Sequence, residues 1–175
     1  MPQPLRLLFI AALAAGAFFL AKNYVAEPFY VASASMEPTL SKDDHMFLDK
    51  LTFHFRLPRR GEIIAFGDPE GRLDKELVKR IIALPGDTVE VKEKQVYVNG
   101  QKLFEPYTQY VRQNEKLQGD NLERTVVPPG SLFVLGDNRD LSADSLSWKN
   151  PETGERILFV NLRAVTGKVR GAYAE

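Results

Sequence analysis

Short apolar runs closed by turn-forming residues are the feature that most restricts how this chain can fold. The runs are rich in Val, Ile and Phe and are bounded by Gly, Pro, Asn or Asp, a pattern typical of β-strands. They cover residues 45–51, 61–67, 76–87, 87–100, 130–137, 155–162 and 164–172. The run 76–87 is ambiguous by periodicity, but its Val, its Ile and its closing Pro-Gly-Asp favour a strand that ends in a turn. In residues 87–100, two alternating valine sets flank four polar residues, which predicts a β-hairpin.

Helix signals are poor after the N-terminal segment. Residues 101–125 are polar and contain proline, and within them we expect residues 114–123 to form a solvated excursion. The predicted fold is mostly β, a single antiparallel and barrel-like sheet domain with a small β protrusion.

An apolar segment at the N-terminus stands apart from this β pattern. Residues 7–21 carry no charge and lie between Arg6 and Lys22. A spanning helix needs about 20 mostly apolar residues, so the run is short, although the two flanking cations can snorkel. We expect an uncleaved single-pass transmembrane anchor over residues 1–23, with a cytoplasmic N-terminus and an extracytoplasmic domain over residues 24–175. The alternative is a cleavable secretion signal, but the small-residue site at residues 32–34 lies far beyond the apolar core.

The composition excludes several classes of function. The 175 residues include 23 basic and 23 acidic side chains, so nothing suggests a nucleic-acid partner. The sequence has no cysteine, which excludes thiol catalysis, disulfides and cysteine-ligated metal. It has two histidines, His45 and His54, which are too few for a histidine-rich metal site. We therefore expect no metal and no cofactor, and a histidine-based triad through His45 is disfavoured because no orienting acid is evident.

Three separated polar stretches could carry chemistry. Ser35 could be a nucleophile if a base lay beside it, but the stretch around it also suits a polar turn. Lys79 lies among apolar residues, and a buried lysine loses its charge and becomes a base, whereas a snorkelling lysine does not. Residues 135–148 suit either a capped loop or a support for that lysine. Taken singly, each stretch favours the structural interpretation.

Together, and in this order, the three stretches resemble a known family. They read S-x-S-M-x-P-T-L from Ser33, K-R-x-x-A-x-P-G-D from Lys79 and G-D-N-R-x-x-S-x-D-S from Gly136. This order is similar to that of the type I signal peptidases, which are membrane-anchored Ser-Lys serine endopeptidases. The segments 41–50, 59–66 and 96–100 fit the same family, so the resemblance runs from the N-terminal segment to about residue 167.

The resemblance implies a role for each matching residue. Ser35 would be the nucleophile and Lys79 its unprotonated base, and the oxyanion would lie between the Ser35 backbone N–H and the Ser33 hydroxyl. Ser142 would hydrogen-bond the lysine and fix its rotamer. The remaining motif residues would hold the last motif against the site: Arg80, Asp137, Arg139 and Asp144.

The resemblance also implies the substrate and the partners. The substrates would be the signal peptides of secretory preproteins, cut after small residues in an Ala-x-Ala pattern, next to the lipid bilayer of a cell membrane. Apolar side chains would line two shallow substrate pockets: Val31, Met36, Leu40 and Val78. The alternatives are a specialised Ser-Lys maturation peptidase with one dedicated partner and a non-catalytic, membrane-anchored peptide-binding β domain.

The sequence departs from the family pattern at four positions: Ala32 replaces proline, Glu62 replaces aspartate, Leu141 replaces asparagine and Leu146 replaces arginine. Without that arginine, Asp144 cannot form the family's usual ion pair, and we expect Arg139 or Arg80 to be its partner instead. The excursion over about residues 88–127 is short and suggests a minimal form of the family's second domain.

Overall fold

The computed structural model describes residues 2–72, 74, 76–112 and 118–172. The helices in these ranges are α1 (Gln3–Tyr24), η1 (Ala34–Met36), α2 (Thr52–Phe55), η2 (Gln118–Asp120) and η3 (Leu162–Ala164). The strands are β1 (Ala26–Tyr30), β2 (His45–Asp49), β3 (Ile63–Gly67), β4 (Glu76–Ala83), β5 (Thr88–Lys92), β6 (Gln95–Val98), β7 (Gln101–Lys102), β8 (Leu122–Val126), β9 (Ser131–Leu135), β10 (Val160–Asn161) and β11 (Val165–Ala172).

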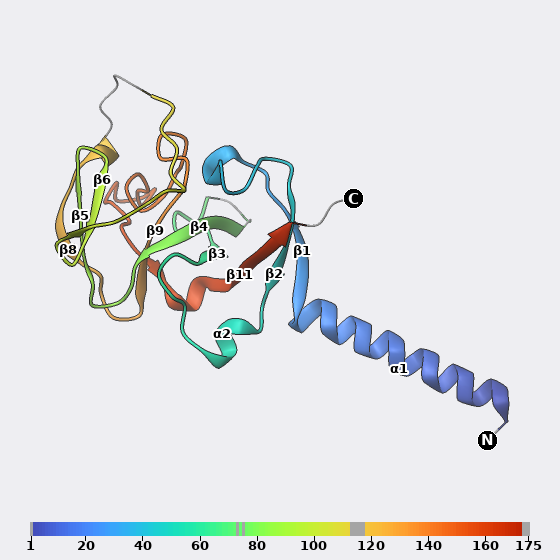
Figure 1. Cartoon of the computed structure of the whole chain (residues 1–175). Coiled ribbons are helices and arrows are strands. Elements are labelled where there is room, and N and C mark those ends of the chain that lie inside the picture. The colour runs from blue at the N-terminus through green and yellow to red at the C-terminus, as the bar shows by residue number, and fades with distance from the viewer. Residues whose placement is uncertain (1, 73, 75, 113–117, 173–175) are drawn as a thin grey trace.

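The strands form two antiparallel sheets (Figure 1). The larger sheet has the order β1-β2-β11-β3-β4-β9-β10, and the smaller has the order β7-β6-β5-β8. Each described pair of named strands is antiparallel, which confirms the predicted mostly antiparallel β fold. The smaller sheet falls within residues 88–126, the segment expected to protrude, while the proposed division into two units stays a prediction.

The β5–β6 hairpin forms where the alternating valines predicted it. Its two loop residues, Glu93 and Lys94, both have positive φ angles, 47° and 68°. Two successive left-handed residues are typical of the turn whose twist matches that of the flanking strands. The valines pair across the hairpin, Val89 with Val98 and Val91 with Val96, and all four are buried.

Several predicted strand boundaries differ from the structure. The run 155–162 contributes only β10, and the polar residues 101–125, where the sequence marks no strand, contain β7 and most of β8. Strand β1 was not predicted because Pro28 interrupts it, and β1 is an edge strand, where proline costs no ladder hydrogen bond.

The buried side chains gather in three clusters that follow the sheets. One cluster holds the inner faces of β5 and β6 together with Ile82, Phe133 and Leu135. A second packs Phe66 and Ile81 against Trp148, whose ring lies edge-on to Phe66 at 5.9 Å. The third surrounds η1, and it therefore fixes the position of the turn that carries Ser35.

The N-terminal segment forms α1, which projects away from the two sheets (Figure 1). Within the described part of the chain, no helix combines the length and apolarity that crossing a membrane requires. The transmembrane anchor predicted over residues 1–23 is thus helical, but its role as a membrane span is not supported. The physical reason is the shortness of the uncharged run at residues 7–21, compared with the about 20 residues that hydrocarbon demands.

Candidate active site

Ser35 and Lys79 meet inside the protein. Ser35 lies in the 3₁₀ turn η1, and Lys79 lies in the middle of β4, opposite Ile64 of β3. The Lys79 Nζ donates a hydrogen bond of 2.8 Å to Ser35 Oγ and a second of 2.9 Å to the Val78 carbonyl. The two residues are 7% and 4% exposed, so this contact is shielded from bulk water.

Burial changes the protonation of Lys79. Loss of hydration lowers the pKa of its amine to about 8, although the nearby carboxylates of Asp144 and Asp137 act in the opposite direction. About a tenth of the amine is therefore uncharged at pH 7 and able to accept a proton, far more than for an exposed lysine. The neighbouring residue on the strand, Arg80, points the other way and pairs with Asp137.

Ser33 lies next to the Ser35 hydroxyl, though not in the way that an extended chain would place it. Ser33 itself is extended, with φ −139° and ψ 157°, while Ser35 belongs to the following 3₁₀ turn. Their Oγ atoms are nevertheless 3.1 Å apart. The same two side chains expected from the sequence are thus adjacent, through a turn rather than through strand alternation.

The loop that follows β9 packs directly on the turn that carries Ser35. The Asn138 backbone N–H donates to the Ser35 carbonyl at 3.1 Å, and the Thr39 hydroxyl donates to Asp137. A Cβ added to Gly136 would lie 2.5 Å from the Ser35 carbonyl oxygen and 2.3 Å from Ser142 Oγ. Only glycine fits this approach, because real Cβ contacts are essentially never that short.

The prediction that Asp144 pairs with Arg139 or Arg80 is wrong. Arg80 pairs with Asp137, and Arg139 pairs with Glu105, so neither replaces the missing family arginine. Asp144 instead accepts hydrogen bonds from the backbone N–H groups of Gly136 and Leu146, at 3.0 and 3.1 Å. It is 3% exposed, and burial raises the pKa of its carboxyl despite these N–H donors.

The expected hydrogen bond from Ser142 to Lys79 is not formed. Of the residues that the structure describes, Lys79 uses Ser35 and Val78 as its partners, and Ser142 Oγ is buried with no partner of normal geometry. Ser142 still lines the loop close to Gly136 and Asp144. Its role in fixing the lysine stays a prediction.

The apolar residues predicted to line substrate pockets belong to one cluster around η1. Val31, Met36 and Leu40 are at most 5% exposed, and Val78 packs against them. They shape the surroundings of Ser35, and their contact with substrate stays a prediction. His45 is not part of this group, since it lies on β2 with its ring against Tyr30.

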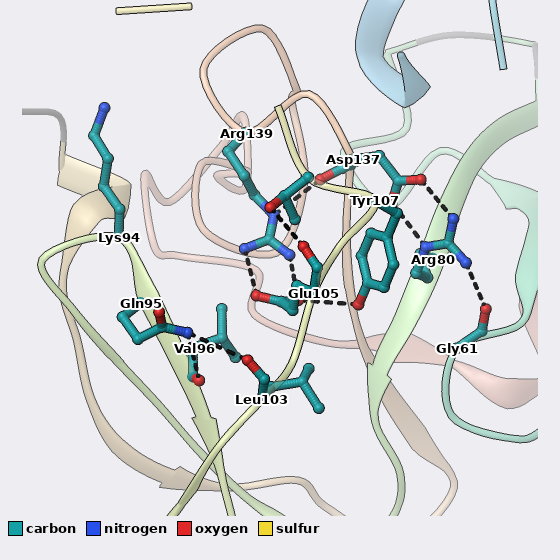
Figure 2. A network of polar contacts seen from close by, with 12 residues as sticks. Gly61, Arg80, Lys94, Gln95, Val96, Leu103, Glu105, Tyr107, Asp137 and Arg139 are labelled. Atoms are coloured by element: carbon teal, nitrogen blue, oxygen red, sulfur yellow. Dashed lines mark hydrogen bonds and ion pairs between the residues drawn. The ribbon is translucent and has the colours of Figure 1, made fainter. Parts of the chain in front are cut away.

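The sequence interpretation missed two residues near the site, Glu105 and Tyr107. Glu105 is hydrogen-bonded to both Arg139 and Tyr107, and the Tyr107 ring lies under Arg80 (Figure 2). They belong to the polar, proline-containing residues 101–125, where no strand periodicity marks them. An aromatic residue next to proline in a polar segment was the available signal.

Glu62, which stands where the family pattern has aspartate, makes several polar contacts. Its carboxylate binds Arg56 from the end of α2 and Lys168 of β11. It also accepts the Arg59 backbone N–H at 2.9 Å. The glutamate therefore ties three segments together beside β3.

Known proteins that are similar to this chain share one family description. The family model for "signal peptidase, peptidase S26" matches residues 4–174. The probable signal peptidase I-1 of Synechocystis sp. is 43% identical over 135 residues, which cover 74% of this chain and 66% of that protein. The signal peptidase I P of Bacillus subtilis subsp. natto is 39% identical over 130 residues, 72% of this chain and 69% of that protein.

A crystal structure of a signal peptidase I from Enterococcus faecalis is 35% identical, with a TM-score of 0.48, and covers 66% of this chain and 98% of that one. The matched regions span 66% and 63% of the lengths of the Synechocystis protein and of the signal peptidase I of Leptolyngbya laminosa. Because the family model covers almost every residue, and because relatives near 40% identity carry the same description, the resemblance to the type I signal peptidases is confirmed. The chain belongs to the signal peptidase family, peptidase S26.

Proposed function

We propose that the chain is a signal peptidase I, an endopeptidase that removes N-terminal signal peptides from exported precursors with a Ser-Lys dyad. The observation that carries this proposal is the buried 2.8 Å hydrogen bond between Lys79 Nζ and Ser35 Oγ. A serine hydroxyl needs an adjacent base to act as a nucleophile. An amine with its pKa lowered to about 8 is such a base near neutral pH.

The proposed reaction follows from these two groups. Lys79 accepts the proton of Ser35 as Oγ attacks the scissile carbonyl, and an acyl-enzyme forms after Lys79 returns that proton to the departing amine. A water molecule, deprotonated by Lys79, then attacks the ester carbonyl. Ser35 leaves as the alcohol after receiving the proton, and the cleaved signal peptide is released.

The tetrahedral intermediate needs hydrogen-bond donors. We assign this role to the Ser35 backbone N–H and the Ser33 hydroxyl, because Ser33 Oγ lies 3.1 Å from the nucleophile. Removal of one such donor typically costs 10²–10³ in turnover, about 2.7–4 kcal/mol.

Sheet geometry supports binding of an extended peptide beside the dyad. In the described ladder, β9 pairs with β4 from Arg80 onwards, whereas β3 pairs with β4 from Glu76 to Arg80. The first half of β4 thus has backbone groups on its β9 side that this ladder does not use. An added substrate strand would pair there, with its scissile bond next to Lys79.

Selection for Ala-x-Ala would come from the apolar cluster around η1. These residues, Val31, Met36, Leu40 and Val78, lie in one apolar cluster, and we expect them to line subsites that admit only small side chains. An apolar pocket distinguishes substrates by about 1–3 kcal/mol per methylene, so rejection of large residues depends on this steric wall.

We also propose that α1 holds the protein at a lipid bilayer. Leu7, Leu8, Phe9 and Ile10 follow one another along the helix and are 60–68% exposed. Successive helical residues point about 100° apart, so no side of α1 is covered by the domain. Apolar surface of this kind marks a membrane or protein contact. The single-pass topology stays a prediction.

Cleavage of an Ala-x-Ala precursor in detergent tests the dyad. We expect Ser35→Ala and Lys79→Ala each to lose at least about 10³-fold in kcat, because neither group acts alone. Ser131→Ala and Lys92→Ala, which change the same residue types outside the site, are the matched controls. If both dyad variants cleave at the wild-type rate, the proposed mechanism is wrong.

A further inference from the structure

A buried polar network includes Arg80, which follows Lys79 on β4, and the proposed mechanism does not use it (Figure 2). It begins at Glu105, which receives two hydrogen bonds from the Arg139 guanidinium, one of them 3.1 Å long. Their side chains are 5% and 7% exposed, so this is an ion pair inside the protein. The Tyr107 hydroxyl donates to the same carboxylate at 3.0 Å.

Tyr107 connects this ion pair to β4. The Arg80 guanidinium carbon lies 4.0 Å from the centre of the Tyr107 ring, within the distance of a cation–π contact. Arg80 Nε donates to Asp137 at 2.8 Å, and Arg80 Nη1 donates to the Gly61 carbonyl at 2.8 Å. The ring therefore covers one face of a guanidinium whose edges are already bound.

Both ends of the network lie on residues that hold the site. Arg80 follows Lys79 on β4, and Asp137 precedes Asn138, whose N–H binds the Ser35 carbonyl. Arg139 Nε donates to the Gly136 carbonyl at 3.1 Å, at the glycine that approaches the nucleophile turn. The segment that carries Glu105 and Tyr107 thus contacts both β4, which carries Lys79, and the loop that packs on the Ser35 turn.

Backbone hydrogen bonds fix the same segment along that loop. The Gln109 N–H donates to the Asp137 carbonyl at 2.9 Å, and the Arg139 N–H donates to the Gln109 carbonyl at 3.0 Å. The N–H groups of Val111 and Arg112 both donate to Asp140, at 2.9 and 2.8 Å. Residues 105–112 therefore form a strap across the loop, with Glu105 and Tyr107 at its buried end.

We propose that Glu105 and Tyr107 are positioning residues of the dyad. They hold Arg80 and the 136–144 loop in the arrangement that keeps Lys79 directed at Ser35. They act through other residues and do not touch the substrate. This inference rests on the proposed function, because its readout is peptide cleavage.

The pH dependence of cleavage is a readout that a purely structural role of these residues would not change. Burial lowers the pKa of Lys79, the Asp144 and Asp137 carboxylates raise it, and Arg80 neutralises Asp137 directly. If Arg80 loses its support and moves from Asp137, the negative potential at Lys79 increases. The protonated amine is then favoured, so the acid limb of the activity profile moves to higher pH.

The test compares Tyr107→Leu with Tyr107→Phe in the full chain. We expect Tyr107→Leu to lower kcat about ten-fold or more, with KM changed less than about two-fold, and to shift the acid limb upwards. Tyr107→Phe keeps the ring under Arg80 and should keep the wild-type acid limb. Tyr97→Leu is the matched control, because Lys92 lies over the Tyr97 ring at 5.6 Å in the smaller sheet.

Wild-type kcat and pH profile in folded Tyr107→Leu would overturn the inference. So would a loss of activity that only follows the loss of folded protein, with no movement of the acid limb. The proposed function fails separately, if the wild type does not cleave the precursor or if Lys79→Ala cleaves it equally well.

Glu105 needs a paired variant. Glu105→Gln leaves the Arg139 charge buried without its partner, which strongly destabilises proteins. Glu105→Gln combined with Arg139→Met removes both charges and keeps similar volumes. We expect this double variant to unfold cooperatively but to lose at least about ten-fold in kcat. A folded double variant with wild-type kcat would show that the ion pair does not position the dyad.

Discussion

At the scale of single residues, the site depends on an amine that burial keeps partly uncharged. Desolvation lowers the pKa of Lys79 to about 8, and the Asp144 and Asp137 carboxylates limit this fall. The strand carries Lys79 into the interior next to Ser35, while Arg80 leaves on the opposite side to bind Asp137. Strand alternation thus gives two adjacent basic side chains different surroundings.

The pH dependence of cleavage follows from this amine. Below pH about 8 the Lys79 amine becomes protonated, so kcat/KM should fall about ten-fold per pH unit with a slope of one. Above that pH the base is uncharged, and activity should reach a plateau. The measurement is kcat/KM of the wild type over roughly pH 6 to 10, a range that brackets the pKa of the Lys79 amine. A profile that stays level across this range would exclude a lysine base.

The proximity of Ser35, Lys79 and Ser33 could be predicted from the sequence because the family motifs bring them together, while their catalytic roles stay a prediction. The partner of Asp144 could not, since its buried carboxylate is held by backbone N–H groups, which no sequence motif displays. Glu105 was missed for a related reason. It binds Arg139 across 34 residues of chain, and no local pattern predicts that pairing.

At the scale of elements, the alternation of apolar and polar residues predicted the regular strands and missed the short or interrupted ones. The β5–β6 hairpin was found because its four valines alternate and are buried. Strands β1 and β8 were missed because proline or polar side chains hide their period, and the neighbouring strand in the sheet stabilises them instead. Propensity is weak evidence at sheet edges, where tertiary pairing decides.

Two loops meet at Gly136, and their close approach yields a prediction at this scale. In Gly136→Ala, the added methyl group would lie 2.3 Å from Ser142 Oγ and 2.5 Å from the Ser35 carbonyl oxygen. The loops must separate, so we expect a loss of about 1–3 kcal/mol in the free energy of unfolding. We also expect about a 10²-fold loss in kcat, because separation displaces the nucleophile. Denaturant unfolding and precursor cleavage measure the two effects.

Gly67→Ala is the matched control for this substitution. Gly67 ends β3, and a Cβ there meets nothing within 4 Å. The unfolding free energy and kcat of Gly67→Ala should stay close to those of the wild type. If Gly136→Ala behaves like this control, the loops are not in the close contact described.

At the scale of the whole molecule, the two sheets and α1 place different demands on their surroundings. The sheets bury three clusters of apolar side chains, whereas α1 exposes apolar side chains such as Leu7, Leu8 and Phe9. Strand β1 follows directly after α1, and the nucleophile turn η1 follows soon after β1. Whatever surface α1 binds is therefore connected to the proposed active site by a short, structured path.

Binding of α1 to lipid can be separated from catalysis in the full chain. Leu8→Glu combined with Leu13→Glu places two charges on side chains that are 68% and 59% exposed. Burying each charge in a bilayer costs about 2.5–3.5 kcal/mol at its centre, so vesicle binding should be lost. Flotation with phosphatidylcholine and phosphatidylglycerol vesicles measures it. Cleavage of a short soluble peptide should not change, because α1 lies outside the dyad.

Val126→Glu, at a 59% exposed position on the smaller sheet, is the control and should float like the wild type. If the α1 variant floats equally well, lipid is not what covers this helix.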